Sequence, residues 1–178
     1  NGVTTTETYA QDFPKIGLLS SRIVRQPAPG SQLIEWLTNT YTVLNLDTTP
    51  NNQRYLPYLS TLQRYDYEVG GPKNGLAVTG TTQNRNVNAW GNATSVSTMV
   101  LDVDTGSPWY GESHGSLVTT TYSENAANWC LALPTARVEG RSVPGGGGQN
   151  RRTHWTAEAA GTCRTTQAVV EPYESGDK

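Results

Sequence analysis

Asp102 and Asp104 are the residues whose type and spacing most directly suggest chemistry in this sequence. They close the segment Ser95–Asp104, in which apolar and polar residues alternate as they do in a half-buried β-strand. Residues two apart in a strand share a face, so the two carboxylates would project together. Carboxylates beside loop carbonyls suit a hard cation such as Ca²⁺. We therefore treat Asp102 and Asp104 as a candidate calcium site, with two solvated carboxylates at a strand end as the alternative.

The tetrapeptide Asp104-Thr-Gly-Ser107 follows this strand directly. An apolar strand that ends in Asp-Thr-Gly-Ser resembles the active-site loop of pepsin-like and retroviral aspartic proteases. In that chemistry two carboxylates share a proton, so that one polarises water while the other protonates the scissile carbonyl. The sequence contains no second Asp-Thr-Gly or Asp-Ser-Gly, so a protease site would need two copies of the chain. Asp102 also departs from the apolar strand of that family.

The run Ser113-His114-Gly-Ser116 contains a hydroxyl and an imidazole, and Asp102 and Asp104 lie upstream. These are the residue types of Ser-His-Asp catalysis, but that triad is defined by geometry, and the nucleophile sequence Gly-x-Ser-x-Gly is absent. An exposed loop histidine is the alternative. We assign no catalytic residue and expect the protein not to be an enzyme.

Aromatic residues stand beside glycine in two places. Trp109 and Tyr110 lie in a Gly-rich and Pro-rich segment, and Trp90 precedes Gly91. Exposed indole and phenol rings form platforms for a sugar or a protein partner, whereas packing in the core is the alternative. Together with His114, these three aromatic residues are our candidate ligand-binding residues.

The composition limits the classes of partner. The formal charge is −2, the pI is about 5.7 and no run of Lys or Arg occurs, so direct nucleic-acid binding is not expected. No apolar stretch approaches the roughly 18 residues of a membrane span. The first residues lack the charged and apolar regions of a signal peptide, so the chain looks like a mature or excised piece.

The abundance of Thr, Asn, Gly and Pro favours strands and turns. We predict an all-β protein, an antiparallel sandwich or a jelly roll or barrel with one or two short helical turns. A single domain over residues 1–178 is expected. Its predicted parts are a polar arm or edge strand over 1–12, a flexible Gly-rich loop over 144–152 and a polar tail over 171–178.

Hydrophobic periodicity places the individual elements. The leucines of Leu56–Leu62 recur at a spacing of three, which predicts a helical turn that leads into a strand over Tyr65–Val69. Further strands are predicted over Ile16–Arg25, Gln32–Leu37, Tyr41–Leu46, Leu76–Thr79, Ser95–Asp104, Ser116–Tyr122, Trp129–Leu133 and Thr162–Val170. Thr38–Thr40 would be a hairpin turn, Gly80–Asn88 a polar loop, and Glu124–Asn128 a helical turn capped by Ser123.

Two further features are left open by the sequence. Cys130 and Cys163 are the only cysteines, and they form either a disulfide or two buried thiols. Asn92-Ala-Thr94 fits the acceptor sequence for N-glycosylation, which operates only in a secretory compartment.

The segment Leu56-Pro-Tyr-Leu-Ser-Thr-Leu-Gln-Arg-Tyr-Asp-Tyr-Glu-Val69 is similar to the helical turn that leads into the third strand of jelly-roll coat proteins of small non-enveloped RNA viruses. The resemblance implies self-assembly and, for a protruding domain, attachment to a host receptor or glycan at the virion surface. The basic arm that binds the genome in many shell domains is missing here, which favours a protruding domain, or a shell domain trimmed of its arm, over an intact coat protein.

Three functions follow. The first is a capsid or virion surface domain that assembles with copies of itself and meets a host receptor or glycan. The second is a secreted glycan-binding or glycan-cleaving β-sandwich, in which Asp102, Asp104 or Glu112 would line a groove with Trp109. The third is the aspartic protease built on Asp104.

Overall fold

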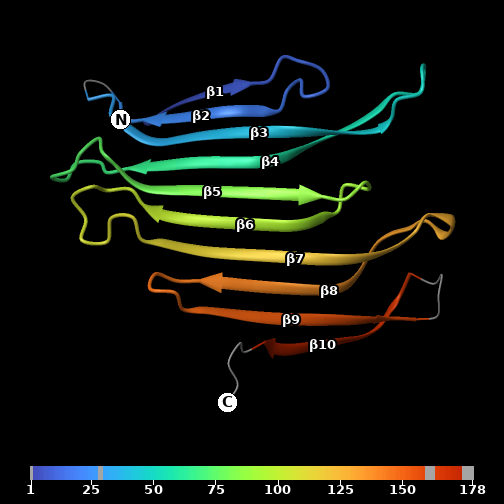
Figure 1. The fold of residues 1–178 in the computed structure, drawn as a ribbon. Coiled ribbons are helices and arrows are strands. Elements are labelled where there is room, and N and C mark those ends of the chain that lie inside the picture. Colours follow the sequence, from blue (N-terminus) through green and yellow to red (C-terminus); the bar gives the residue numbers. More distant parts are fainter. Residues whose placement is uncertain (1, 28–29, 159–162, 174–178) are drawn as a thin grey trace. The chain divides into compact units, whose positions relative to one another are not determined.

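The computed structural model describes residues 2–27, 30–158 and 163–173. Residues 171–173 are described by their backbone alone. The described residues form ten β-strands and one 3₁₀ turn (Figure 1). The strands are β1 (Thr4–Tyr9), β2 (Leu19–Arg25), β3 (Leu33–Asp47), β4 (Arg54–Tyr67), β5 (Ala77–Val87), β6 (Ala93–Asp102), β7 (Ser113–Asn125), β8 (Cys130–Ser142), β9 (Gly148–Ala157) and β10 (Thr165–Tyr173), and the turn η1 is Ala126–Asn128.

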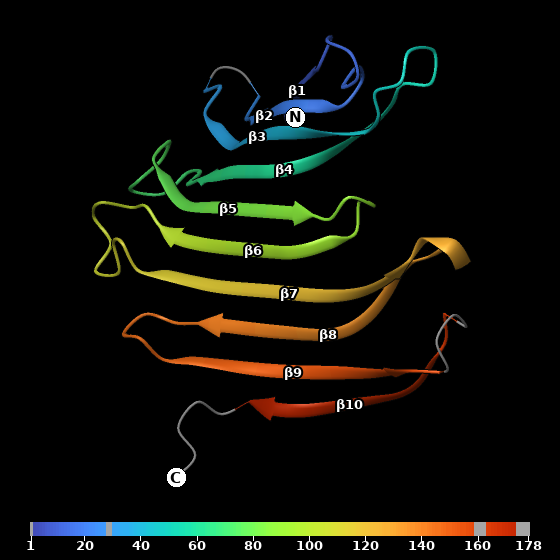
Figure 2. The ribbon, with the colours of Figure 1, turned by 45° about the vertical axis from the view of Figure 1, so that its right-hand side comes forward.

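The order of the strands in the sheet is their order in the chain, and the paired strands run antiparallel (Figure 2). The prediction of an antiparallel all-β protein with a short helical turn is therefore confirmed. The connectivity is up-and-down, whereas a jelly roll needs Greek-key crossovers, so the expected jelly-roll connections are not those of the described strands.

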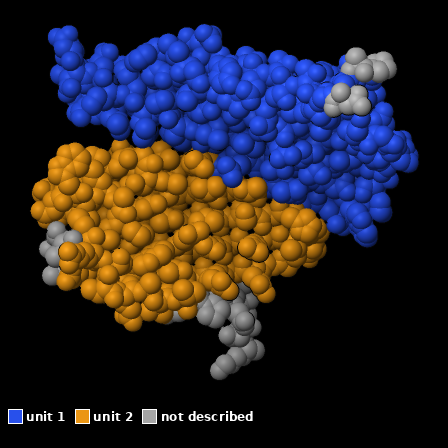
Figure 3. All heavy atoms as spheres, turned by 180° about the vertical axis from the view of Figure 1, so that it is seen from behind, with its two compact units in different colours: residues 1–84, 99–113 blue, residues 85–98, 114–178 orange. Residues whose placement is uncertain are grey.

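The chain divides into two compact units, coloured separately in Figure 3. Unit 1 comprises residues 1–84 and 99–113, and unit 2 comprises residues 85–98 and 114–178. Each unit is described by itself below.

The predicted helical turn at Leu56–Leu62 is wrong, because these residues lie within β4. A β-bulge explains the misleading spacing of three. Thr40 of β3 pairs with Thr61 and Tyr41 pairs with Leu59, so Ser60 is an extra residue on β4. The extra residue brings Leu59 and Leu62 onto the same face of the sheet, as a helix would.

Three other predicted boundaries are also wrong. Thr38–Thr40 is not a turn, because these residues lie within β3. The side-chain amide of Asn39 donates to the carbonyl of Leu19, 2.9 Å away. The expected polar loop at Gly80–Asn88 is mostly β5, whose polar residues pair along β4. Within the expected loop 144–152, the residues from Gly148 onward begin β9. In each case cross-strand pairing outweighs turn-forming composition.

The remaining expectations agree more closely. The predicted strand over Ser95–Asp104 is β6, and the predicted helical turn near Glu124 is η1, capped by Asn125 rather than by Ser123. The start of the polar arm is the edge strand β1, and β10 extends into the expected tail as far as Tyr173. Residues 174–178 of that tail lie outside the described residues.

One face of the unit 1 sheet carries an ionic network around a buried glutamate. Glu35 is buried, and its Oε1 accepts hydrogen bonds from Nε and Nη2 of Arg22 at 2.8 and 2.7 Å. Its Oε2 lies 3.2 Å from Nε of Arg64, which also binds Asp66 at 2.6 Å through Nη2. Leu37 pairs with Arg22 on β2 and with Arg64 on β4, so the arginine stems flank it and account for its burial.

The other face of the same strands is free of charge over its central part, and we call it the uncharged face. Strand register and side-chain alternation define it. On β3 and β4 it comprises Trp36, Thr38, Thr40, Thr42, Leu44, Leu56, Tyr58, Thr61, Gln63 and Tyr65, and on the flanking strands Thr6, Thr8, Ser21, Ile23, Gly80, Thr82 and Asn84. Three charged residues that share this face, Arg25, Asp47 and Arg54, lie at strand ends.

Apolar burial is sparse in both units. Among the described residues, Leu37 in unit 1 and Cys130 in unit 2 are the only buried hydrophobic side chains, and no large side chain is fully buried. In each unit, both faces of the sheet are therefore largely open to solvent, in contrast to sheets that are covered by a second layer.

Gly80 provides the first test of this packing. A Cβ atom there would lie 3.3 Å from Tyr65 Cε1 and 3.1 Å from Val103 Cγ1, so the tyrosine ring and the valine fill the space above the glycine. We expect Gly80→Val to destabilise the protein by about 1–3 kcal/mol through overpacking. Thr82→Val, two residues along the same face, is the matched control and should be nearly neutral. Urea denaturation measures both, and equal effects would contradict this packing.

Glu35 provides the second test. Glu35→Gln removes the carboxylate that Arg22 and Arg64 share and leaves Arg64 with Asp66 alone. We expect a loss of about 1–3 kcal/mol, less than for a fully buried pair because both arginines are partly exposed. The matched control is Glu139→Gln, which breaks the exposed Arg137–Glu139 pair of 2.7 Å and should cost less than about 1 kcal/mol. Free energies of unfolding in urea compare the two substitutions, and a smaller loss at Glu35 would refute the assigned role.

Candidate functional site

The aspartates singled out by the sequence lie at the last residue of β6 and in the connection from β6 to β7. We call residues 102–112 the aspartate loop. Asp104 is 8% exposed. Its Oδ1 accepts the N–H of Gly106 at 2.9 Å, and its Oδ2 forms an ion pair with the ammonium group of Lys73. Its own N–H donates to Asp102 Oδ1 at 2.9 Å. Both oxygens of Asp104 are therefore engaged within unit 1.

Asp102 holds the other side of the aspartate loop. Its Oδ2 accepts the hydroxyl of Ser107 at 2.6 Å, and that hydroxyl oxygen accepts the N–H of Trp109 at 3.1 Å. The backbone of Asp102 donates to the carbonyl of Glu112 at 3.0 Å and accepts from Gly111 at 2.9 Å. Side-chain acceptors of this kind mimic backbone turns, which explains why Asp, Gly and Ser occur in this order.

The electrostatics of the aspartate loop favour a charged Asp104. The hydrogen bond from Lys73, followed by that from Gly106, lowers the pKa of Asp104 below its usual value. A protease dyad instead needs one carboxyl that keeps a proton. In this structure the positive charge beside Asp104 is the ammonium group of Lys73, whereas the sequence analysis placed Ca²⁺ there. Among the described residues, no three His, Cys, Asp or Glu side chains lie close enough to hold a metal ion. The calcium site and the protease stay predictions.

Trp109 and Tyr110 project from the aspartate loop into solvent. They are 61% and 58% exposed, so packing in the core does not apply to them. Hydrogen bonds from Tyr110 N to Ser107 O, 3.2 Å, and from Glu112 N to Trp109 O, 2.8 Å, fix the backbone on which both rings stand. The two rings are thus presented by an ordered turn at the surface of unit 1.

Trp90 and His114 belong to unit 2, not to the unit of Trp109 and Tyr110. Trp90 is 44% exposed, and its indole Nε1 donates to Glu124 Oε2 at 2.9 Å. Asn88 binds the same carboxylate, and its Oδ1 accepts the N–H of Trp90 at 3.0 Å. His114 is exposed on β7. The four candidate ligand-binding residues therefore divide into two pairs, one in each unit.

No local pattern in the sequence singles out Lys73, Glu124 or Trp129. Lys73 and Glu124 bind their partners 31 and 34 residues away along the chain, a separation that hides such pairs from local pattern analysis. Trp129 is highly exposed and has a left-handed backbone, with φ at 54°. Its position beside a cysteine and after a helical turn was the only available signal.

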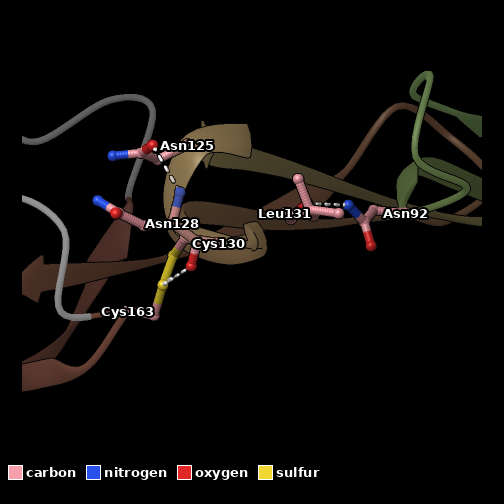
Figure 4. Close-up of a disulfide and its surroundings, with 6 residues drawn as sticks. All are labelled: Asn92, Asn125, Asn128, Cys130, Leu131 and Cys163. Carbon is pink, nitrogen blue, oxygen red and sulfur yellow. Dashed lines mark hydrogen bonds between the residues drawn. A yellow bond between two sulfur atoms is a disulfide. The ribbon is translucent and has the colours of Figure 1, made fainter.

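Cys130 and Cys163 form a disulfide, which settles the alternative left open by the sequence (Figure 4). Closing a loop of 33 residues stabilises the folded state by about 4 kcal/mol in the chain-entropy account. Asn92, in the glycosylation sequence, directs its side-chain amide at the carbonyl of Leu131, as Figure 4 shows. A glycan on that nitrogen would replace one of its two hydrogens and leave the other to donate this hydrogen bond.

Comparison with protein-family models, with curated proteins and with solved structures found no match to this chain. In the part of the chain that the structure describes, no helix has the length and hydropathy needed to cross a membrane.

The lowered pKa of Asp104 predicts an acid dependence of stability. A carboxyl whose pKa is depressed by folding contributes stability that is present above its unfolded pKa, about 4, and is lost as the pH falls through the lower folded value. We expect Asp104→Asn to reduce stability at pH 7 and to weaken the further loss between about pH 4 and pH 2.

Lys73→Met should change the acid dependence in the same direction, because it removes the main cause of the depressed pKa. Urea midpoints measured across this pH range test both variants. An Asp104→Asn variant that keeps the full acid dependence of the wild type would show that other carboxyls are responsible.

Proposed function

We propose that this chain is a structural, non-enzymatic β-module that associates with a second copy of itself through the uncharged face of unit 1. The observation that carries the proposal is the exposure of Trp36, 42%, on that face near the start of β3. Its neighbours across the strands are Ile23 and Tyr65, whose ring centroid lies 6.1 Å from that of Trp36.

Such a face exposes apolar side chains to water, and covering them by another protein surface is favourable. Burial of apolar area on association gains roughly 25 cal/mol per Å² before the costs of binding, and aromatic side chains bring the largest areas. The threonines between them have a β-branched carbon and a small hydroxyl, so they pack flat without burying a charge. A second sheet layer is the covering that such a face fits best.

The distribution of charge favours a second copy as the partner. In a two-fold contact the same patch meets itself, so a charged residue close to the axis would face its own like charge. The uncharged face has none in its central part. Arg25 and Arg54 at its ends already bind the carbonyl of Ser31, 3.1 Å, and Asp47, 3.3 Å. The opposite face carries Arg22, Glu35, Arg64 and Asp66, so two copies that met through it would bring charged side chains together.

The aspartate loop supports the non-enzymatic part of the proposal, since Asp102 and Asp104 are both engaged in holding the loop. A place in a viral coat, as the resemblance implied, is one setting in which such assembly operates, and the virion surface remains our proposed location. The exposed pair Trp109 and Tyr110 favours the second candidate, a secreted glycan-binding protein, because aromatic faces stack on sugar rings.

Thr42→Lys tests the proposed contact. Thr42 is exposed on the uncharged face, and a lysine there would bring like charges together across a two-fold interface. We expect the wild type to associate with increasing concentration in sedimentation velocity, and Thr42→Lys to raise the dissociation constant at least roughly tenfold, since each 1.4 kcal/mol is a factor of ten.

Asn45→Lys is the matched control. Asn45 is exposed on the opposite face of the same strand, so the variant carries the same added charge away from the contact. Its dissociation constant should equal that of the wild type. A wild type that stays monomeric at every concentration, or equal effects of the two lysines, would overturn the proposal.

A further inference from the structure

Four charged residues gather on one face of unit 2. Arg137, Glu139 and Arg141 alternate along β8 and therefore share a face, and Arg151 of β9 pairs directly with Glu139. We propose that this cluster, the arginine patch, is a binding site for sulfated polysaccharide. The site lies in a different unit from the uncharged face and does not depend on self-association.

The arginine patch has an excess of positive charge. Arg137 binds Glu139 at 2.7 Å, while among the described side chains Arg141 and Arg151 have no ion-pair partner. Three guanidinium groups therefore surround one carboxylate, a local net charge of about +2 from the ordinary ionisation of these groups. The arginines are exposed. Excess positive charge on an exposed patch favours the binding of anions.

The spacing of the arginines suits a row of anionic groups rather than a single ion. Arg137 and Arg141 lie four residues apart on one strand, about 13 Å at the usual strand rise. Arg151 lies on the neighbouring strand opposite the midpoint between them, about 8 Å from each. Guanidinium groups bind oxyanions through paired, planar hydrogen bonds. A chain that carries sulfates at intervals can engage all three arginines at once, whereas an isolated ion engages one.

The surroundings of the patch suit a sugar backbone. Thr120 and Thr153 flank Arg137 across the strands, and Gln149 pairs with Arg141. Their hydroxyl and amide groups both donate and accept hydrogen bonds, as sugar hydroxyls require. Trp155 follows Thr153 by two residues on β9, so it lies on the same face and offers an aromatic surface to a sugar ring.

Sulfated polysaccharide fits these observations better than nucleic acid does. Nucleic-acid affinity grows with the number of phosphates neutralised, and three arginines on a chain of net charge −2 neutralise few. The Cys130–Cys163 disulfide also indicates an oxidising environment outside the cytosol, where sulfated polysaccharides occur.

Heparin is the probe for the test. We expect the wild type to bind immobilised heparin and to lose binding to chemically desulfated heparin. Arg151→Gln should weaken the heparin affinity roughly two- to fivefold and reduce the slope of log affinity against log salt concentration by about one. Glu139→Gln should strengthen binding, because it removes the only negative charge at the centre of the patch.

Arg152→Gln is the matched control, since it removes the same charge from the adjacent residue, which faces the other side of β9. Its heparin affinity should stay near that of the wild type, and all variants should unfold at wild-type urea concentrations because the altered side chains are exposed. Equal losses in Arg151→Gln and Arg152→Gln, weaker binding of Glu139→Gln, or tighter binding to polyuridylate than to heparin would each overturn the proposal.

Discussion

The position of Glu35 is the constraint on which unit 1 depends. A carboxylate on the middle of a sheet face is costly to bury unless opposite charges and hydrogen bonds compensate it. Arg22 and Arg64 provide both from the two neighbouring strands, and Asp66 in turn binds Arg64. A register shift of β2 or β4 against β3 by one residue would turn an arginine to the opposite face. The network therefore specifies how the three strands align.

The same network separates the roles of the two faces. Because all four charged side chains lie on one face, the central part of the other is left to threonines and aromatic residues. In a thin sheet with little apolar burial, that separation decides which face is free to meet another protein surface. Unit 2 differs, since its arginine patch carries charge that is only partly paired. One chain thus presents two surfaces of different chemistry.

The sequence predicts the all-β class and β6, because regular alternation is a local signal, and it places the helical turn η1 within two residues but assigns its cap to the wrong residue. It misplaces the elements whose structure depends on distant pairing. The leucine spacing in β4 reflects a bulge that only the register with β3 reveals, and Gly80–Asn88 is a strand because β4 lies beside it. At the aspartate loop the residue types were recognised, but Lys73 was not, since its contact with Asp104 spans 31 positions.

The bulge at Ser60 has a mechanical consequence for the long hairpin of β3 and β4. Its hydroxyl donates to the carbonyl of Thr40 at 3.0 Å, which fastens the extra residue in place. A bulge bends its strand and increases the local twist, so we expect the surface of the hairpin to change direction at Ser60. A flat partner would then contact the hairpin on one side of Ser60 only, and a partner that covers both sides would need a matching curvature.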